Sequence, residues 1–229
     1  THCISSAASD VYKRQEYMHQ SATLPKTFKQ VMAESERTLI GVWLCSGSTM
    51  VTEIAAGSGL DWLMIDGEHA PLSLETVQRQ LQVAAAYSVT PVVRVPTNDK
   101  VIIKQYLDLG AQSLIVPMVN SAADAADAVR ALRYPPAGVR GVGAALSRGA
   151  RWNRVDDYLH RANDELVSLV VQIESQQAVE NVTEIAATDG VDGVFIGPND
   201  LAASMGLLGQ PGHPAVSYTH LTLPTICSV

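Results

Sequence analysis

The stretch LMIDGEHA at residues 63–70 decides the fold, because an apolar run ends abruptly in two acids and a histidine. Such a run is typical of a buried strand in a parallel sheet that carries polar groups at its carboxyl end. Three further segments repeat the pattern, namely VVR at 92–94, VVQIE at 170–174 and VFIGPND at 194–200. The sequence therefore predicts that polar side chains gather at one end of a parallel sheet.

Composition and charge narrow the class of protein. The chain has 229 residues, 47% of them hydrophobic and 17% charged, which suits one domain of moderate size. Its net charge of -7 argues against nucleic acid and anionic membranes as partners and favours a small molecule. We find no charge-free apolar stretch of about 18 residues, no signal peptide, and no disulfide or zinc pattern among the cysteines. We expect a soluble cytoplasmic protein.

The two ends of the chain differ from its interior. Residues 1–15 and 216–229 lack helical or strand periodicity, and both resemble translated sequencing-adaptor read-through. We expect a non-native leader at 1–17, a barrel domain at 18–215 and a non-native tail at 216–229. On this interpretation Met18 is the natural start, and the natural carboxyl end has been lost near residues 214–216.

Between the ends, short apolar runs alternate with longer amphipathic stretches, which indicates repeated βα units. Residues 73–87 and 121–133 each place an apolar stripe on one helical face, and Asn98 and Ser121 are candidate amino-terminal caps. Six strands are expected, at 39–44, 61–66, 90–95, 112–117, 166–173 and 192–197.

A chain made only of βα units forms either an open doubly wound sheet or a closed eightfold barrel. A doubly wound sheet concentrates its site at one switch point after a glycine-rich turn. Here polar groups instead follow the second, third, fifth and sixth strands. We therefore expect an α/β protein with a TIM (β/α)8 barrel, incomplete at about six of the eight units.

Glu174 and Asp200 are the candidate metal ligands. Each ends a strand, and neighbouring strands lie about 4.8 Å apart, so both carboxylates can reach one ion. Two carboxylates with water suit magnesium or manganese. The alternative is structural, with Glu174 as a helix-capping acid and Asp200 as the amino-terminal cap of a short helix at 201–205.

Asp66, His69 and Arg94 are the candidate catalytic residues. A carboxylate beside an imidazole fixes its tautomer and raises its basicity, as a general base requires. A solvated surface position is the alternative for a loop histidine such as His69. Arg94 ends an apolar strand, so its charge calls for an anionic substrate or, alternatively, an ion pair with Asp66 or Glu68.

Two further features carry weaker signals. Gln172 shares its strand face with Glu174 and is a candidate for orienting substrate or a metal-bound water, although an edge amide is equally compatible. The basic, glycine-rich segment at 138–151 could offer backbone amides to a carboxylate, but it matches neither the P-loop nor the dinucleotide motif.

As a set, these residues resemble the HpcH/HpaI family of class II pyruvate aldolases. Several motifs in the same order are far more specific than any one of them. The resemblance covers about residues 26–215, with IDGEHAP at 65–71, PVVRV at 91–95, GAQSLIVPMV at 110–119, RYPPAGVRGVG at 133–143, VQIES at 171–175 and DGVFIGPNDLAASMG at 192–206.

The resemblance implies a lyase that reversibly cleaves a 4-hydroxy-2-oxo acid, of the 4-hydroxy-2-oxoheptanedioate type, into pyruvate and an aldehyde through a metal-stabilised enolate. Glu174 and Asp200 would hold Mg²⁺, Mn²⁺ or Co²⁺, and Arg94 would neutralise oxyanion charge. Asp66 and His69 would move the proton of the hydroxyl group. The family also implies a homo-oligomer, hexameric in relatives, and a role in aromatic compound catabolism. The implied substrate-binding residues are Arg94, Gln172, Gly197, Pro198 and Asn199.

Three other functions are compatible with the same residues. A related member would cleave 2-keto-3-deoxy sugar acids of the rhamnonate or glucarate type. The citrate lyase β-like branch would need a phosphate groove for a CoA thioester. A non-catalytic binding module on a truncated barrel is the third possibility. The basic residues available for a CoA groove are Arg140, Arg148, Arg151 and Arg154.

Overall fold

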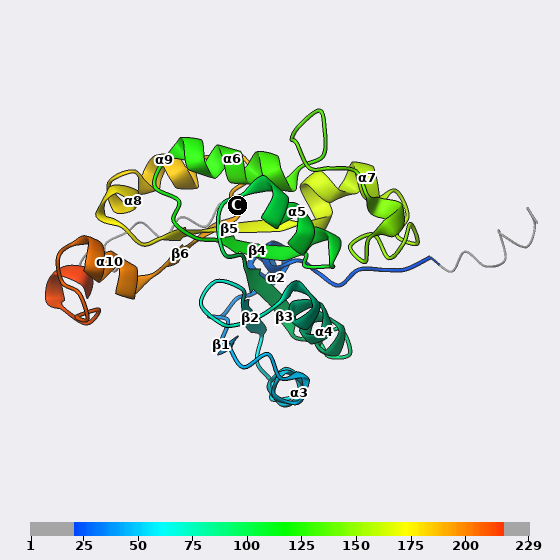
Figure 1. The fold of residues 1–229 in the computed structure, drawn as a ribbon, viewed down its shortest axis with the longest axis horizontal. Coiled ribbons are helices and arrows are strands. Elements are labelled where there is room, and N and C mark those ends of the chain that lie inside the picture. The colour runs from blue at the N-terminus through cyan, green and yellow to red at the C-terminus, as the bar shows by residue number, and fades with distance from the viewer. Residues whose placement is uncertain (1–20, 218–229) are drawn as a thin grey trace, which may run out of the picture.

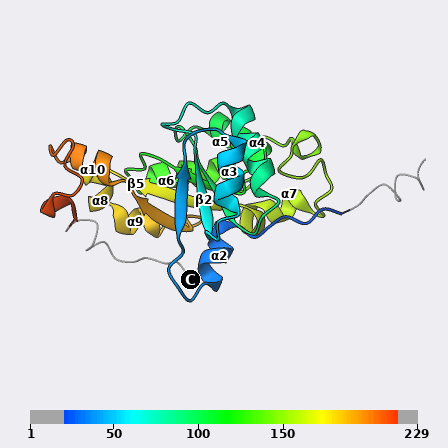
Figure 2. The same cartoon turned by 90° about the horizontal axis from the view of Figure 1, so that it is seen from below.

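The computed structural model describes residues 21–217 as a curled sheet of six parallel strands with helices along its outer side (Figure 1, Figure 2). The strands pair in the order of the sequence. Each lies within two residues of its expected bounds, so the prediction of repeated βα units is confirmed. The strands are β1 (Gly41–Leu44), β2 (Trp62–Asp66), β3 (Thr90–Arg94), β4 (Ser113–Val116), β5 (Ser168–Ile173) and β6 (Gly193–Ile196).

The curl makes half of a barrel. Within residues 21–217, β1 and β6 are the two edges of the sheet and do not pair with each other, so an eightfold barrel is not present there. The α/β class and the six units agree with expectation. The proposed leader at 1–17 and most of the proposed tail, from 218 onward, lie outside the described residues. Val216, at the start of that tail, is buried beside Leu201 and Ala202.

Polar side chains begin several of the helices. Ser121 caps α6, as expected. The cap of α5 is Asp99 rather than Asn98, because the Asp99 carboxylate accepts the N–H groups of Val101 and Ile102 at 2.8 and 3.0 Å. Among the described residues, no helix combines the length and the hydropathy needed to cross a bilayer. The helices are α2 (Phe28–Glu34), α3 (Thr49–Ala56), α4 (Leu74–Ala84), α5 (Lys100–Asp108), α6 (Ala122–Leu132), η1 (Ala144–Leu146), α7 (Tyr158–Arg161), η2 (Ala162–Leu166), α8 (Gln176–Glu180), α9 (Val182–Ala186) and α10 (Pro198–Ser204).

The strands present one apolar face to the helices and another to the inside of the curl. Leu63 and Ile65 of β2 belong to the core formed with the outer helices, whereas Met64 between them belongs to the inner cluster. Because strand side chains alternate between faces, Asp66 shares the inner face with Met64, and Arg94 shares it with Val92. Two-residue periodicity thus directs the polar strand ends to the inside.

Helix α2 closes the amino end of the inner face. Phe28 donates its N–H to Ser113 Oγ at 2.9 Å, where β4 begins, and its ring lies 5.3 Å from that of Trp62. An apolar groove of about 530 Å³ continues along the inner face and reaches Ile115 and Phe195. The inner face is therefore only partly covered by the described residues.

The basic segment at 138–151 lies at the amino ends of the strands, because it follows α6 and precedes β5. Arg148 is buried, and its guanidinium donates to the carbonyl oxygens of Leu81 and Leu109 at 3.4 Å, where α4 and α5 end. Burial and the charge of Arg151 lower the pKa of Arg148 to about 10. Arg140 is also buried, 4.5 Å from the ring of Tyr134. These arginines hold helix ends together and do not form an open groove.

We expect Arg148→Ala to lower the free energy of unfolding by about 2 to 3 kcal/mol, because it leaves a cavity and removes a hydrogen-bond donor from two carbonyl groups. Urea titration measures this change. Arg130→Ala is the matched control, since the Arg130 side chain is 59% exposed and lies 3.8 Å from its acid partner. Equal stability losses in the two variants would contradict a structural role for Arg148.

Candidate active site

The polar residues predicted as a site meet at the carboxyl ends of the strands. In the parallel register Asp66 of β2 lies opposite Arg94 of β3, and Gln172 of β5 lies opposite Phe195 of β6. Glu174 follows Gln172 by two residues and so extends the same inner face. The register therefore gathers side chains that are far apart in the sequence.

Arg94 contacts three other residues of this cluster. Its Nε and Nη2 donate to the two carboxylate oxygens of Asp66, both at 2.9 Å, and its Nη1 faces Glu68 Oε2 at 2.9 Å. The guanidinium carbon lies 4.5 Å above the ring of Trp43. The side chains of Arg94 and Asp66 are only 7% and 3% exposed, so each charge needs the other. The ion pair considered as an alternative for Arg94 is therefore present.

The two acids around Arg94 differ in their affinity for protons. Burial acts to raise the pKa of Asp66, but hydrogen bonds from Arg94 and from the Glu68 N–H outweigh it and hold the pKa below its usual value. Burial raises the pKa of Glu68; Arg94 opposes this rise, and the charge of Glu174 adds to it. Of the two carboxylates, Glu68 takes up a proton more readily.

His69 does not pair with Asp66 as expected. Asp66 Oδ1 accepts the backbone N–H groups of Glu68 and His69 at 3.1 and 3.3 Å, while both oxygens bind Arg94. The imidazole is 64% exposed, and its Nε2 lies 3.9 Å from Glu68 Oε2. The expected pairing of the Asp66 carboxylate with the imidazole was wrong, because a buried guanidinium competes more strongly for that carboxylate than an exposed imidazole.

Glu174 is held by hydrogen bonds from two sides. The N–H of Met118 donates to Oε1 at 2.6 Å, and Nε2 of Gln172 donates to Oε2. Burial raises the pKa of Glu174; these two hydrogen bonds oppose the rise, and the charge of Asp200 adds to it. Oε1 of Gln172 is buried without a hydrogen-bond partner among the described residues. Gln172 therefore contacts the candidate metal ligand directly.

Gly197 brings the backbone after β6 close to Glu174. A Cβ at this position would lie 2.8 Å from Glu174 Oε2 and 2.9 Å from Gln172 Nε2, so no larger residue fits without displacing them. The N–H of Gly197 donates to the Ile173 carbonyl at 3.0 Å, which fixes this approach. Pro198 and Asn199, predicted as substrate-binding residues, follow as exposed residues at the start of α10.

Asp200 lies exposed in the first turn of α10, near enough to Glu174 for its charge to act there. Neither acid is a helix cap, since Ser175 precedes α8 and Gly197 precedes α10, so the structural alternative was wrong. Within residues 21–217, no group of three or more His, Cys, Asp or Glu side chains is arranged to hold a metal. The two carboxylates and the unpartnered oxygen of Gln172 nevertheless form a hard donor set that fits a divalent cation completed by water or substrate.

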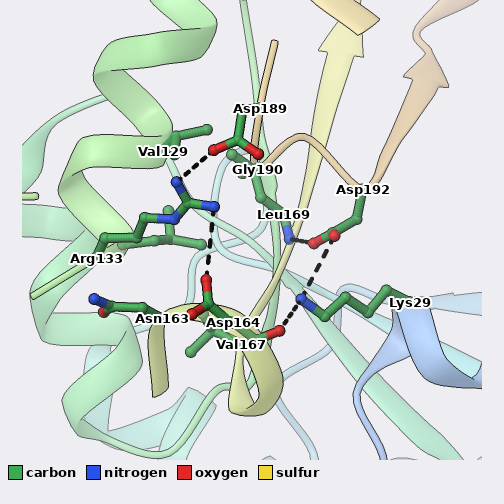
Figure 3. Close-up of a pocket in the computed structure, with 11 residues that line it drawn as sticks. Lys29, Val129, Arg133, Asn163, Asp164, Val167, Leu169, Asp189, Gly190 and Asp192 are labelled. Carbon is green, nitrogen blue, oxygen red and sulfur yellow. Dashed lines mark hydrogen bonds and ion pairs between the residues drawn. The ribbon is translucent and has the colours of Figure 1, made fainter. Parts of the chain in front are cut away.

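A cavity of about 170 Å³ lies at the opposite end of the sheet (Figure 3). Its charged side chains pair with one another, Arg133 with Asp189 at 2.8 Å and Lys29 with Asp192 at 3.6 Å. Asp189 and Asp192 precede β6, which places the cavity at the amino ends of the strands. Because its cations already have carboxylate partners, we do not assign it as a substrate site.

Three residues of the site were not predicted from the sequence. Trp43 and Cys45 alternate along β1 and the residue after it, and Cys45 Sγ lies 3.9 Å from Asp66 Oδ2. Their two-residue spacing was the signal that could have placed them on the inner face. Met118 contributes a backbone N–H and has a φ of 54°. No pattern of side-chain types reveals a contribution of this kind.

Comparisons with known proteins agree with this arrangement. The sequence profile of the HpcH/HpaI aldolase/citrate lyase family matches residues 39–228. A 4-hydroxy-2-oxo-heptane-1,7-dioate aldolase of Salmonella arizonae is 55% identical over 193 residues, which cover 84% of this chain and 73% of the relative. A protein of the same name from Escherichia coli is 54% identical over 193 residues, which again cover 84% of this chain and 73% of the relative.

Solved structures support the same grouping. An HpcH/HpaI aldolase/citrate lyase family protein from Burkholderia cenocepacia has a TM-score of 0.79 and 43% identity, over 84% of this chain and 77% of that one. An HpcH/HpaI aldolase from Desulfitobacterium hafniense has a TM-score of 0.76 and 32% identity, over 86% of this chain and 75% of that one. Half-barrel and site thus define an α/β protein of the aldolase type. The chain belongs to the HpcH/HpaI aldolase/citrate lyase family.

We expect Asp66→Asn to lower the free energy of unfolding by about 3 kcal/mol near neutral pH, because it leaves a buried guanidinium with one carboxylate partner. The pKa of Asp66 is lowered in the folded state, so its contribution is present above the unfolded pKa of about 3.9 and is lost as pH falls through the folded pKa. The difference between wild type and variant should therefore shrink below about pH 4.

Urea titrations of wild type and variant at about pH 7, 5 and 3 test this linkage. Asp189→Asn is the control, because Asp189 also pairs with an arginine but its side chain is 91% exposed. A difference for Asp66→Asn that persists unchanged at the lowest pH would show that the ion pair is not its source.

Proposed function

We propose that this chain is a divalent-metal-dependent aldolase that reversibly cleaves a 4-hydroxy-2-oxo acid into pyruvate and an aldehyde. The observation that carries the proposal is that a buried, preoriented Arg94 and the carboxylates of Glu174 and Asp200 belong to one electrostatic cluster. A 2-oxo acid offers an anionic carboxylate and a keto oxygen, which call for a cation and for hard-metal coordination. The names of the most similar relatives support 4-hydroxy-2-oxo-heptane-1,7-dioate as the first substrate to test.

Glu174 and Asp200 would hold the divalent ion, with Mg²⁺ and Mn²⁺ as the first candidates and Co²⁺ as a third. When bound, such an ion supplies Lewis acidity toward the keto oxygen of the substrate. Gln172 holds one oxygen of Glu174, and its own Oε1 is buried without a hydrogen-bond partner among the described residues. Gly197 lets the backbone after β6 approach Glu174 closely, and backbone groups at 197–199 would approach the pyruvate carboxylate.

Arg94 stabilises the negative charge that develops on the substrate oxygen. Asp66 and Glu68 hold the guanidinium from its edge and Trp43 covers its face, so its orientation is set before substrate arrives. A preorganised donor of this type contributes about 3 to 4 kcal/mol to transition-state stabilisation. In this proposal Asp66 is a positioning residue for Arg94 rather than the partner of the base.

His69 is the proposed general base. Its exposed imidazole accepts the proton of the substrate 4-hydroxyl during cleavage and returns it during condensation. Glu68, whose Oε2 lies 3.9 Å from His69 Nε2, stabilises the imidazolium that forms. The proposal therefore transfers to Glu68 the supporting role that the sequence suggested for Asp66.

The contacts of the arginines and of the candidate site bear differently on the three alternative functions. The buried positions of Arg140 and Arg148, at the amino ends of the strands, do not favour a CoA thioester as substrate. A 2-keto-3-deoxy sugar acid presents the same carboxylate and keto group, so it remains the alternative substrate class. A non-catalytic binding module would bind these acids without releasing pyruvate.

We also propose a homo-oligomer in the cytoplasm. Exposed apolar side chains just before β1 and on α3 support self-association, since Ile40, Met50 and Ile54 are 56%, 70% and 67% exposed. Cys45 is a free thiol, which is in keeping with a reducing compartment.

Glu174→Gln should abolish metal-dependent pyruvate release, because an amide cannot replace an anionic ligand. Release from 4-hydroxy-2-oxoheptanedioate and from a 2-keto-3-deoxy sugar acid is measured with Mg²⁺, Mn²⁺ and EDTA. Glu180→Gln, an exposed substitution on α8, is the matched control and should retain wild-type activity. Metal-independent release, or full activity in Glu174→Gln, would refute the proposed mechanism, and binding without release would favour the module.

His69→Gln should lower kcat by about 100- to 10,000-fold while the affinity for pyruvate and Mn²⁺ stays close to wild type, because only proton transfer is removed. Steady-state kinetics and pyruvate titration separate these effects. His160→Gln is the control, as His160 is 85% exposed and lies on α7, away from the site. An unchanged kcat in His69→Gln would assign the proton to another group.

A further inference from the structure

We infer that Asn120 is a positioning residue that fixes the Glu174 carboxylate for cation binding, an inference that rests on the proposed function. Asn120 lies in the loop between β4 and α6, and Glu174 follows the neighbouring strand β5. The side chain of Asn120 links this loop to the residue after Glu174, and through Met118 to the carboxylate itself. It touches no oxygen of Glu174 directly, so its effect passes through these partners.

The contacts form a closed circuit. Met118 donates its N–H to Glu174 Oε1 at 2.6 Å, and the carbonyl of Met118 accepts Nδ2 of Asn120 at 3.1 Å. The hydroxyl of Ser175 donates to Asn120 Oδ1, and the peptide bond from Ser175 to Glu174 completes the circuit. A carboxylate held in this way has lost most of its rotamer freedom before a cation arrives, so that cost does not fall on binding.

The backbone of Met118 needs this support. Its φ of 54° lies in the left-handed region, which a residue with a side chain keeps only when its surroundings hold it there. The side chain of Asn120 holds the Met118 carbonyl, while the main chain of Asn120 makes two contacts outside the circuit. Its N–H donates to Asp124 Oδ2 at 3.1 Å, and its carbonyl accepts Nδ2 of Asn181 at 2.8 Å.

The carboxamide of Asn120 has the chemistry that this position requires. It donates through Nδ2 and accepts through Oδ1, and the circuit uses both groups. Aspartate has the same shape but would place an anionic oxygen against the carbonyl of Met118. Alanine would remove both links. Removing groups that orient metal ligands typically weakens metal binding by about 10- to 100-fold.

The test is the dissociation constant of Mn²⁺ for the full chain, measured by isothermal titration calorimetry. We expect Asn120→Asp and Asn120→Ala to weaken Mn²⁺ binding by at least about 10-fold. Ser175→Ala breaks the circuit at a different link and should act in the same direction. Asn181→Ala is the matched control, because it removes a contact to the Asn120 main chain but leaves the circuit intact.

Thermal unfolding of each variant without metal separates loss of the circuit from general loosening of the loop. Mn²⁺ binding at wild-type strength in both Asn120 variants, or an equal loss in Asn181→Ala, would overturn the inference and leave the proposed function standing. If the wild type binds no Mn²⁺, or if Glu174→Gln binds it as the wild type does, the proposed function fails together with the inference.

Discussion

Parallel pairing of neighbouring strands is the constraint on which the rest of this molecule depends. Because all six strands run in one direction, their carboxyl ends lie together at one end of the sheet. Period-two alternation then sends Asp66, Arg94, Gln172 and Glu174 to the inner face, while the residues between them pack against the helices. The helices return the chain to the amino ends of the strands, where the buried arginines of the segment after α6 hold helix ends together.

The buried guanidinium of Arg94 determines the contacts of the acids at the carboxyl ends of the strands. Arg94 is too well buried to stand alone, so it takes both oxygens of Asp66 and the nearer oxygen of Glu68. This pairing gives the two acids different partners. Asp66 is held as an anion by Arg94, whereas Glu68 faces both Arg94 and the imidazole of His69. The difference in partners follows from competition for carboxylate oxygens rather than from the order of residues in the loop.

Backbone geometry matters as much as side-chain type around Glu174. An N–H from the left-handed Met118 and the missing side chain of Gly197 both act on this carboxylate, from the loops after β4 and β6. Neither contribution depends on the chemical character of a side chain. The neighbours of β5 therefore shape the candidate cation site, although they supply no acid other than Asp200.

The sequence by itself determined the strands, their parallel order and the residues that would lie at their carboxyl ends. Apolar runs and alternation are local properties, and each expected strand lies within two residues of the observed one. Which residues contact one another was decided only by the tertiary structure. Asp66 lies three residues from His69 in the chain yet binds Arg94, because the register of β2 and β3 places the guanidinium directly opposite. The cap of α5 and the contact of Met118 with Glu174 likewise depend on atomic distances and backbone angles that residue types do not encode.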